Sequence, residues 1–175
     1  MTDRVRVQVS GPLATVTLAR PAKHNGVDFA MMRALIDAAH RLKADRAIRG
    51  VLVTGEGPSF CAGLDFKSVF GTPVRTALGV AKLWSPVRNQ FQAVSLVWRE
   101  LGVPVIAAIH GACFGAGLQL ALGCDLRVAT ADSTLSFMEA KYGLVPDMGG
   151  IALLRELVRL DVAKELVMTG RVVTG

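Results

Sequence analysis

The sequence predicts an α/β fold built as a single domain. Three observations support this prediction: strand and helix patterns recur in turn, 51% of the residues are hydrophobic, and neither a linker nor an internal repeat interrupts the chain. Strands that recur with helices between them are typical of α/β folds. A chain of 175 residues is also long enough to bury one sizeable core. We therefore expect residues 1–175 to form one domain.

The N-terminal elements follow from two kinds of periodicity. The expected elements are, in order, strand 5–9, strand 14–18, a helix over about 28–42 and strand 51–54. Apolar residues alternate with polar ones in the first two strands, and Gly11 and Pro12 form a turn between them. Apolar residues then recur at helical spacing after Asp28, whose side chain suits a helix N-cap. The strand VLVT ends in a glycine-rich loop, GEGPSFCAGLD.

The remaining elements are shorter or more apolar. The expected elements are, in order, a helix over 77–101, strand 103–109, a short buried helix that opens at about Gly117, strands 125–130 and 134–137, and helical segments 151–160 and 162–168. Pro86 must start, end or kink the first of these helices, because proline lacks a backbone donor and clashes with the preceding turn.

Charge and composition exclude several classes of protein. The net charge is +6, but the basic residues are spread from Arg4 to Arg171 instead of forming the concentrated patch of a nucleic-acid face. A mild positive excess suits an anionic small molecule better. The three cysteines match no CxxC pattern and the three histidines lack metal-ligand spacing. We therefore expect buried reduced cysteines, no metal and a cytoplasmic location.

One stretch also raises the alternative of a membrane helix. Residues 103–124 carry no charged side chain over 22 positions and contain a GxxxG pattern, which is a feature of paired membrane helices. Pro104, His110 and Gln119 interrupt this run, and its glycines make a poor helix interior. A buried strand, a glycine turn and a short buried helix explain the stretch better, and we expect no membrane partner.

Two glycine loops follow predicted strands and share a physical signature. They are FCAGLD at 60–65 and CFGAGLQ at 113–119. Small residues let a ligand approach the main chain and leave N–H groups free to bind it, and a helix opening here adds the positive end of its dipole. Two converging amides would form an oxyanion hole. Spacing alone equally allows tight turns that only pack helix against strand, and no GxGxxG, Walker A or GxSxG motif is present.

Four blocks of the sequence resemble one known superfamily. The stretches SFCAGLDF, IHGACFGAGLQLALGCDLRVAT and FMEAKYGLVPDMGG, preceded by VTLARPAKHNGV, resemble the crotonase, or enoyl-CoA hydratase/isomerase, superfamily. The resemblance spans nearly the whole chain. It implies a spiral of ββα units that binds acyl-CoA thioesters and holds the thioester oxygen with two backbone N–H groups to stabilise an enolate. It also implies no separate cofactor, since coenzyme A is part of the substrate, and a homotrimer or dimer of trimers.

The resemblance assigns roles to individual positions. The two oxyanion-hole amides correspond to Leu64 and Ala116, where the family often has glycine at the second position. Glu139 matches one of two catalytic glutamates, and Gln119 stands where hydratases of the family have the other. Glutamine can hydrogen-bond a water but cannot accept and return a proton. Asp147 offers another carboxylate, as in dienoyl-CoA isomerases of the family.

The same comparison suggests where the substrate lies. Coenzyme A is expected along the first glycine loop, near Ala62, Gly63 and Asp65, and beside Gly115 of the second. Lys23 or Arg20 is a candidate for its phosphates. The acyl pocket is expected within residues 66–100, whose aromatic residues are Phe66, Phe70, Trp84, Phe91 and Trp98. Ordinary core packing of these aromatics remains an alternative.

The reaction expected from this pattern is double-bond isomerisation, because the hydratase pair of glutamates is incomplete. A true hydratase that uses Glu139, with Gln119 only positioning water, is one alternative; a non-catalytic acyl-CoA-binding or assembly subunit is another. Restoring the pair with Gln119→Glu should raise hydration. The sequence ends where members of the superfamily continue into a C-terminal helical region, which is therefore naturally short or missing here. The apolar stretch 151–168 would then need a cover that this sequence does not contain.

Overall fold

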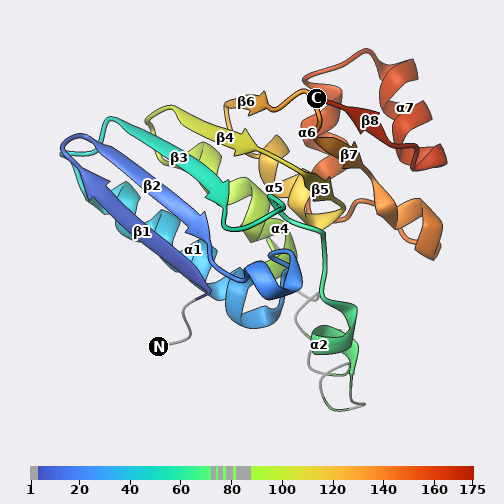
Figure 1. Cartoon of the computed structure of the whole chain (residues 1–175), viewed down its shortest axis with the longest axis horizontal. Helices are drawn as coiled ribbons and strands as arrows, with labels where there is room; N and C mark the ends of the chain where they lie inside the picture. Colours follow the sequence, from blue (N-terminus) through green and yellow to red (C-terminus); the bar gives the residue numbers. More distant parts are fainter. Residues whose placement is uncertain (1–3, 72–73, 75–76, 78–80, 82–87) are drawn as a thin grey trace.

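The computed structural model describes residues 4–71, 74, 77, 81 and 88–175. Helices and strands are organised around two sheets (Figure 1). The larger sheet has the order β1-β2-β3-β4-β6 and the smaller one the order β5-β7-β8. The strands are β1 (Val5–Ser10), β2 (Leu13–Leu18), β3 (Gly50–Gly55), β4 (Val105–Ile109), β5 (Ala112–Phe114), β6 (Leu126–Ala129), β7 (Thr134–Ser136) and β8 (Val173–Thr174). This architecture confirms the α/β class.

The larger sheet begins with the predicted hairpin. Strands β1 and β2 are antiparallel, with Val7 opposite Val16, and β3, β4 and β6 are added in parallel. Alternate residues of β2 are buried, as the sequence pattern predicted, because that face lies against the helices. Helices α1 (Phe29–Ala44) and α4 (Gln90–Leu96) lie on this one side of the sheet (Figure 1).

Helix α1 starts and faces the core as its sequence predicted. The Asp28 side chain accepts a hydrogen bond from the Met31 N–H at 2.8 Å, so Asp28 is the N-cap. The apolar positions of the helix are buried, namely Met31, Met32, Leu35, Ala38, Ala39 and Leu42. Burial of this stripe against the sheet supplies much of the stability of such a helix.

The uncharged stretch 103–124 folds as a strand, a glycine turn and a short buried helix. After β4 the chain forms the short strand β5 and then helix α5 (Ala116–Leu122), whose seven residues are all buried. Strand β5 was not predicted, because three residues carry too little periodicity to be recognised. In the part of the chain that the structure describes, no helix has the length and apolarity to cross a membrane.

The segment between the two glycine loops differs from expectation where it is described. A short helix, α2 (Phe66–Phe70), directly follows the first loop and was not predicted. The expected helix 77–101 is represented by α4 and the 3-10 helix η2 (Val97–Glu100). Residues 72–73, 75–76, 78–80 and 82–87, which include Trp84 and Pro86, lie outside the described residues.

The C-terminal part carries two helices and closes the smaller sheet. The 3-10 helix η3 (Met138–Tyr142) precedes α6 (Gly150–Arg155) and α7 (Leu160–Thr169). Helix α6 is shorter than the expected segment 151–160, because the chain turns after Arg155 through the hydrogen bond from the Leu157 N–H to the Leu154 carbonyl. Strand β8, two residues long, pairs antiparallel with β7 and was not predicted.

Candidate active site

The two glycine loops run side by side. Cys61 in the first loop pairs with Cys113 of β5 in a parallel bridge. The Cys61 N–H donates to the Ala112 carbonyl at 3.0 Å, and the Phe114 N–H donates to the Cys61 carbonyl at 2.9 Å. These hydrogen bonds fix the first loop against β5, just before α5 begins, so that segments about 50 residues apart lie side by side.

Two glycines allow this close approach. A Cβ added to Gly117 would lie 2.6 Å from both the Cβ and the carbonyl oxygen of Cys61, and no side chain fits there. Gly63 has a φ of +104°, and a Cβ added to it would lie 3.2 Å from the Phe114 carbonyl oxygen and 3.9 Å from the Ala116 nitrogen. The glycines therefore have the packing role that spacing alone had left open, and they also bring the two main chains together.

The backbone N–H groups of Leu64 and Ala116 are both available to a ligand. Ala116 is the first residue of α5, and an N–H at this position has no acceptor within its own helix. On either side of Leu64 the backbone bonds to Val27, through the Gly63 carbonyl and the Asp65 N–H. Neither the Leu64 N–H nor the Ala116 N–H donates to any of the described residues. Two N–H donors beside one cleft can hold an anionic oxygen.

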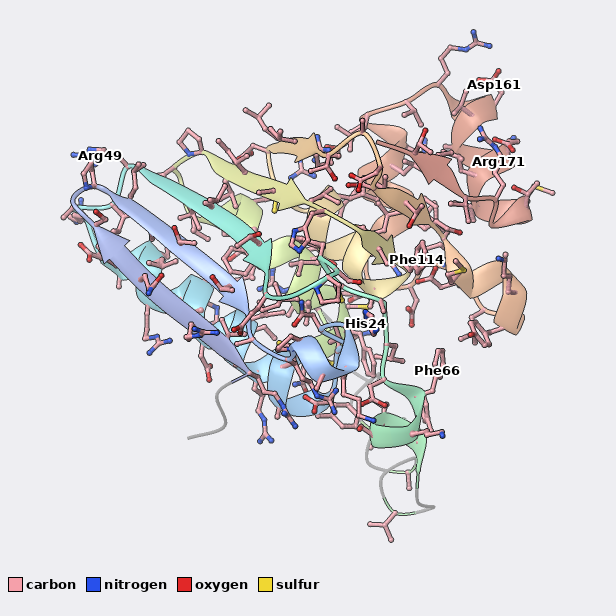
Figure 2. The ribbon with its side chains drawn as sticks, in the orientation of Figure 1. His24, Arg49, Phe66, Phe114, Asp161 and Arg171 are labelled. Carbon is pink, nitrogen blue, oxygen red and sulfur yellow. The ribbon has the colours of Figure 1, made fainter. Side chains whose placement is uncertain are left out.

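The cleft beside these amides is closed on another side by Glu139. It is lined by Ala62, Gly63, Leu64, Phe66, Phe114, Gly115, Met138, Glu139 and Tyr142. Phe66 projects from the start of α2 and Phe114 from the end of β5 (Figure 2). The predicted residues Ala62, Gly63, Leu64, Gly115 and Glu139 are thus brought to one place.

Glu139 is half-buried and only one of its carboxyl oxygens is hydrogen-bonded by a side chain. Its Oε1 accepts from the Gln119 Nε2 at 2.7 Å, whereas its Oε2 is buried without a hydrogen-bond partner among the described residues. The side chain lies against Gly115, where an added Cβ would be 3.2 Å from Oε1. Burial raises the pKa of Glu139; the hydrogen bond from Gln119 lowers it in part, and the nearby charge of Asp147 raises it further.

Asp147 shares a second cavity with Glu139. This cavity is lined by Leu64, Phe66, Phe70, Phe91, Glu139, Leu144, Val145, Asp147 and Met148. Asp147 lies exposed at its rim, and partial loss of solvent beside apolar side chains raises the pKa of its carboxyl group above the ordinary value. An apolar cavity with two carboxyl groups of raised pKa can exchange protons with a bound molecule.

Gln119 is placed differently from the other candidates. Its side chain is fully buried, with an exposed fraction of 0%, and it lines neither cavity. Besides donating to Glu139, it accepts at Oε1 from the Met148 N–H at 2.9 Å and the Gly150 N–H at 3.0 Å. Gln119 therefore contacts the protein at both ends of its amide and reaches the cleft only through Glu139.

The candidates for binding coenzyme A fall into two groups. Ala62 is exposed beside the cleft, and Lys23 is exposed at the end of the 3-10 helix η1 (Pro21–Lys23). Asp65 instead caps α2 by accepting from the Ser68 N–H at 3.1 Å, and it forms an ion pair with Arg20 at 2.8 Å. Burial raises the pKa of Asp65, but the contacts with Ser68 and Arg20 outweigh this and lower it. Lys23 is thus the freer of the two predicted cations.

The aromatic residues expected in an acyl pocket are divided between pocket and core. Phe66, Phe70 and Phe91 line the cavity that holds Asp147. Trp98 is buried in the core and donates from Nε1 to the Val94 carbonyl, which fits the core alternative. Sequence reasoning missed Tyr142, whose ring packs on Phe66 with 5.1 Å between centroids; its only signal was its position three residues after Glu139.

The three cysteines are buried, and they are not grouped with other potential metal ligands in the described residues. No cluster of three or more histidine, cysteine or acidic residues suited to a metal ion occurs among them. All three cysteines are free and buried, as expected. Burial raises the pKa of Cys61 and of Cys124 to about 12, so these thiols stay protonated near neutral pH.

Comparisons with known proteins identify relatives of this chain. The family model for enoyl-CoA hydratase/isomerase matches residues 8–175. Carnitinyl-CoA dehydratase of Salmonella enteritidis PT4 (strain P125109) is 34% identical over 172 residues, which cover 98% of this chain and 62% of that protein. Mitochondrial methylglutaconyl-CoA hydratase of Homo sapiens is 34% identical over 152 residues, which cover 86% of this chain and 43% of that protein.

Solved structures agree with these sequence relatives. The crystal structure of an enoyl-CoA hydratase from Bacillus anthracis matches with a TM-score of 0.87 at 28% identity, over 99% of this chain and 65% of that one. The chain thus spans 43% and 62% of the length of the two curated relatives. With the predicted superfamily and its fold confirmed, the chain belongs to the enoyl-CoA hydratase/isomerase family.

Proposed function

We propose that this chain binds an acyl-CoA thioester and moves a double bond within its acyl group. The observation that carries the proposal is one cleft lined by Leu64, Gly115 and Glu139. The N–H groups of Leu64 and of Ala116, the residue after Gly115, donate to none of the described residues, and Oε2 of Glu139 has no hydrogen-bond partner among them. The N–H groups are suited to the thioester oxygen and the carboxylate to a proton on the neighbouring carbon. Coenzyme A is part of the substrate, and the reaction needs no further cofactor.

The chemistry follows from these contacts. The Glu139 carboxylate removes a proton from the carbon between the thioester carbonyl and the double bond of a 3-enoyl-CoA. The electron pair moves toward the carbonyl, and the two N–H groups stabilise the resulting enolate oxygen. Glu139 then returns the same proton to the far end of the former double bond, which yields a 2-enoyl-CoA. A raised pKa favours this shuttle, because the group must both take and give a proton.

The burial of Gln119 supports isomerisation over hydration. Addition of water in the family resemblance uses two glutamates, and the amide of Gln119 neither accepts a proton nor reaches the cleft. Asp147, at the rim of the apolar cavity, is suited to protonate a carbon farther along the acyl chain. A 3,5-dienoyl-CoA is therefore a candidate substrate beside simple 3-enoyl-CoA.

Hydration through Glu139 is the second candidate function. Two relatives, a hydratase and a dehydratase, favour it, and Asp147 supplies a second carboxyl group in the same cavity as Glu139. A non-catalytic acyl-CoA-binding subunit would show binding without turnover of any enoyl-CoA.

Turnover of three substrates by three proteins tests the proposal. We expect the wild type to convert 3-enoyl-CoA faster than it hydrates 2-enoyl-CoA, measured by absorbance and chromatography. Glu139→Gln should lose about 100- to 10000-fold in isomerisation, the usual contribution of a general acid/base. Asp147→Asn should slow 3,5-dienoyl-CoA more than 3-enoyl-CoA. Brisk hydration that survives Glu139→Gln would show that both the assigned residue and the assigned reaction are wrong.

A further inference from the structure

Gln119 is the polar residue of an otherwise apolar helix. The other residues of α5 are alanine, glycine and leucine, and all seven positions are buried. A buried amide is costly unless its donors and acceptors are satisfied. The contacts that satisfy Gln119 therefore indicate what its side chain does.

The amide oxygen of Gln119 holds the start of α6. Oε1 accepts from the N–H groups of Met148 and Gly150, and Gly149, the N-cap of α6, supplies no side-chain cap of its own. A Cβ on Gly150 would lie 2.6 Å from this oxygen, so the glycine leaves room for the contact. Because two N–H donors face Oε1, the opposite end of the amide must be the NH₂ group.

The NH₂ group of Gln119 thereby faces Glu139. Nε2 donates to Oε1 of Glu139 at 2.7 Å, and this contact leaves Oε2 as the unpaired oxygen. The charged neighbour that acts on Glu139 is Asp147, which follows Pro146 and directly precedes Met148 in the segment held by Gln119. One side chain thus holds both Glu139 and the turn that carries Asp147.

We propose that Gln119 is a positioning residue that aims Glu139 into the cleft and sets its distance from Asp147. This inference deepens the proposed function and rests on Glu139 as its acid/base. Gln119 keeps one oxygen of Glu139 occupied, which leaves the other to meet the substrate. It also ties the Glu139 carboxyl group and the backbone of the segment that follows Asp147 to one buried helix. Such support keeps a reacting group in productive geometry.

The identity of residue 119 decides whether both contacts form. A glutamate could accept from Met148 and Gly150 but could not donate to Glu139 unless the two carboxyl groups share a proton. A methionine fills a similar volume but leaves the two N–H groups and Glu139 without their partner. If Gln119 had a structural role alone, its replacement would destabilise the protein but would leave the pKa of Glu139 unchanged.

The test follows the carboxyl group of Glu139 directly. Its protonation is measured by difference infrared titration, with the band assigned by its loss in Glu139→Gln. In Gln119→Met the midpoint should rise by about one pH unit, because the carboxylate form of Glu139 loses the hydrogen bond that favours it. Gly150→Ala, which displaces the Gln119 oxygen from outside α5, should shift it in the same direction. The matched control Gln8→Met, exposed on β1, should not shift it.

Two results would overturn the inference. One is an unchanged Glu139 titration in a folded Gln119→Met protein. The other needs no variant: in wild-type protein the side-chain amide resonances of Gln119 should move with the Glu139 titration, and their failure to respond would separate the two groups. Neither measurement uses turnover. A shifted titration without conversion of any enoyl-CoA would therefore contradict the proposed function and leave the positioning role intact.

Discussion

Glu139 is held in a state that costs the folded protein stability. Its folded pKa is raised above the ordinary value, chiefly by burial, so the native state binds its proton more tightly than the unfolded chain does. The stability that comes from this proton is present below the unfolded pKa, about 4.3, and is lost as pH rises through the folded pKa. Such a cost is typical of residues placed for chemistry.

The substitution Glu139→Gln should therefore stabilise the protein at neutral and alkaline pH while it removes activity. The amide carries no charge to desolvate and no repulsion with Asp147. Urea unfolding at a series of pH values measures this. The advantage of the variant should shrink as pH falls through the raised folded pKa and should level off below about 4.3, where the wild-type carboxyl group is protonated in both states. Asp132→Asn, an exposed carboxylate changed in the same way, is the control. A Glu139→Gln protein that is less stable than wild type at pH 8 would contradict this account of the site.

At the scale of elements, the site is the junction of one loop, one short strand and one short helix. The first glycine loop pairs with β5, and α5 begins immediately beyond it. Ala116 is the first residue of this helix, a position where proline is well tolerated because the N–H has no intrahelical acceptor. Substitution at this position can therefore remove one donor while it preserves the helix.

We expect Ala116→Pro to fold with nearly the stability of wild type and to lose about 100- to 1000-fold in rate, the usual cost of one oxyanion-hole donor. Circular dichroism and thermal unfolding check the fold. Difference infrared spectra of a bound, non-reacting acyl-CoA should show that the thioester carbonyl band loses its shift. Ala116→Gly keeps the N–H and should keep the shifted band. An unshifted band in wild type, or a full shift in Ala116→Pro, would exclude this amide as a donor.

At the scale of the molecule, apolar side chains remain exposed on the C-terminal helices. Helices α6 and α7 enclose an apolar groove lined by Ile151, Leu154, Arg155, Leu160, Ala163, Lys164, Val167 and Met168. Met168 is the most exposed large hydrophobic residue of the described chain, at 77%. The expectation that this stretch packs against something outside this sequence stays a prediction, as do the single domain, the cytoplasmic location and the trimeric assembly.

If copies of the chain cover this surface, the protein should sediment as a trimer or a dimer of trimers at micromolar concentration. Met168→Glu places a charge on the apolar surface and should shift the distribution toward monomer by at least about tenfold in dissociation constant, since burying an unpaired charge is costly. Gln8→Glu, on edge strand β1 away from these helices (Figure 1), is the control. Sedimentation velocity that shows a monomer in wild type would contradict the assembly.

Elements whose signal is local and repeated could be predicted from the amino-acid sequence. We could predict the β1–β2 hairpin, the helix that follows Asp28 and the strand before each glycine loop. In each of them, apolar residues recur with a regular period over a short stretch of sequence. The resemblance to the superfamily further predicted Leu64, Ala116 and Glu139 as parts of one site. Elements of two or three residues, β5 and β8, carry too short a pattern to be read in this way.

The contacts that join the residues of the site arise from tertiary packing and could not be predicted from local sequence. The contact of Gln119 with Glu139, Met148 and Gly150 joins positions 20 to 31 residues apart, and no local pattern encodes such a contact. Burial, which depends on every segment packed around a group, decided that Glu139 keeps one oxygen unpaired and that Gln119 stays out of the cleft. The candidate residues could therefore be identified from the sequence. Their protonation and the orientation of their side chains depend on the packing that surrounds them.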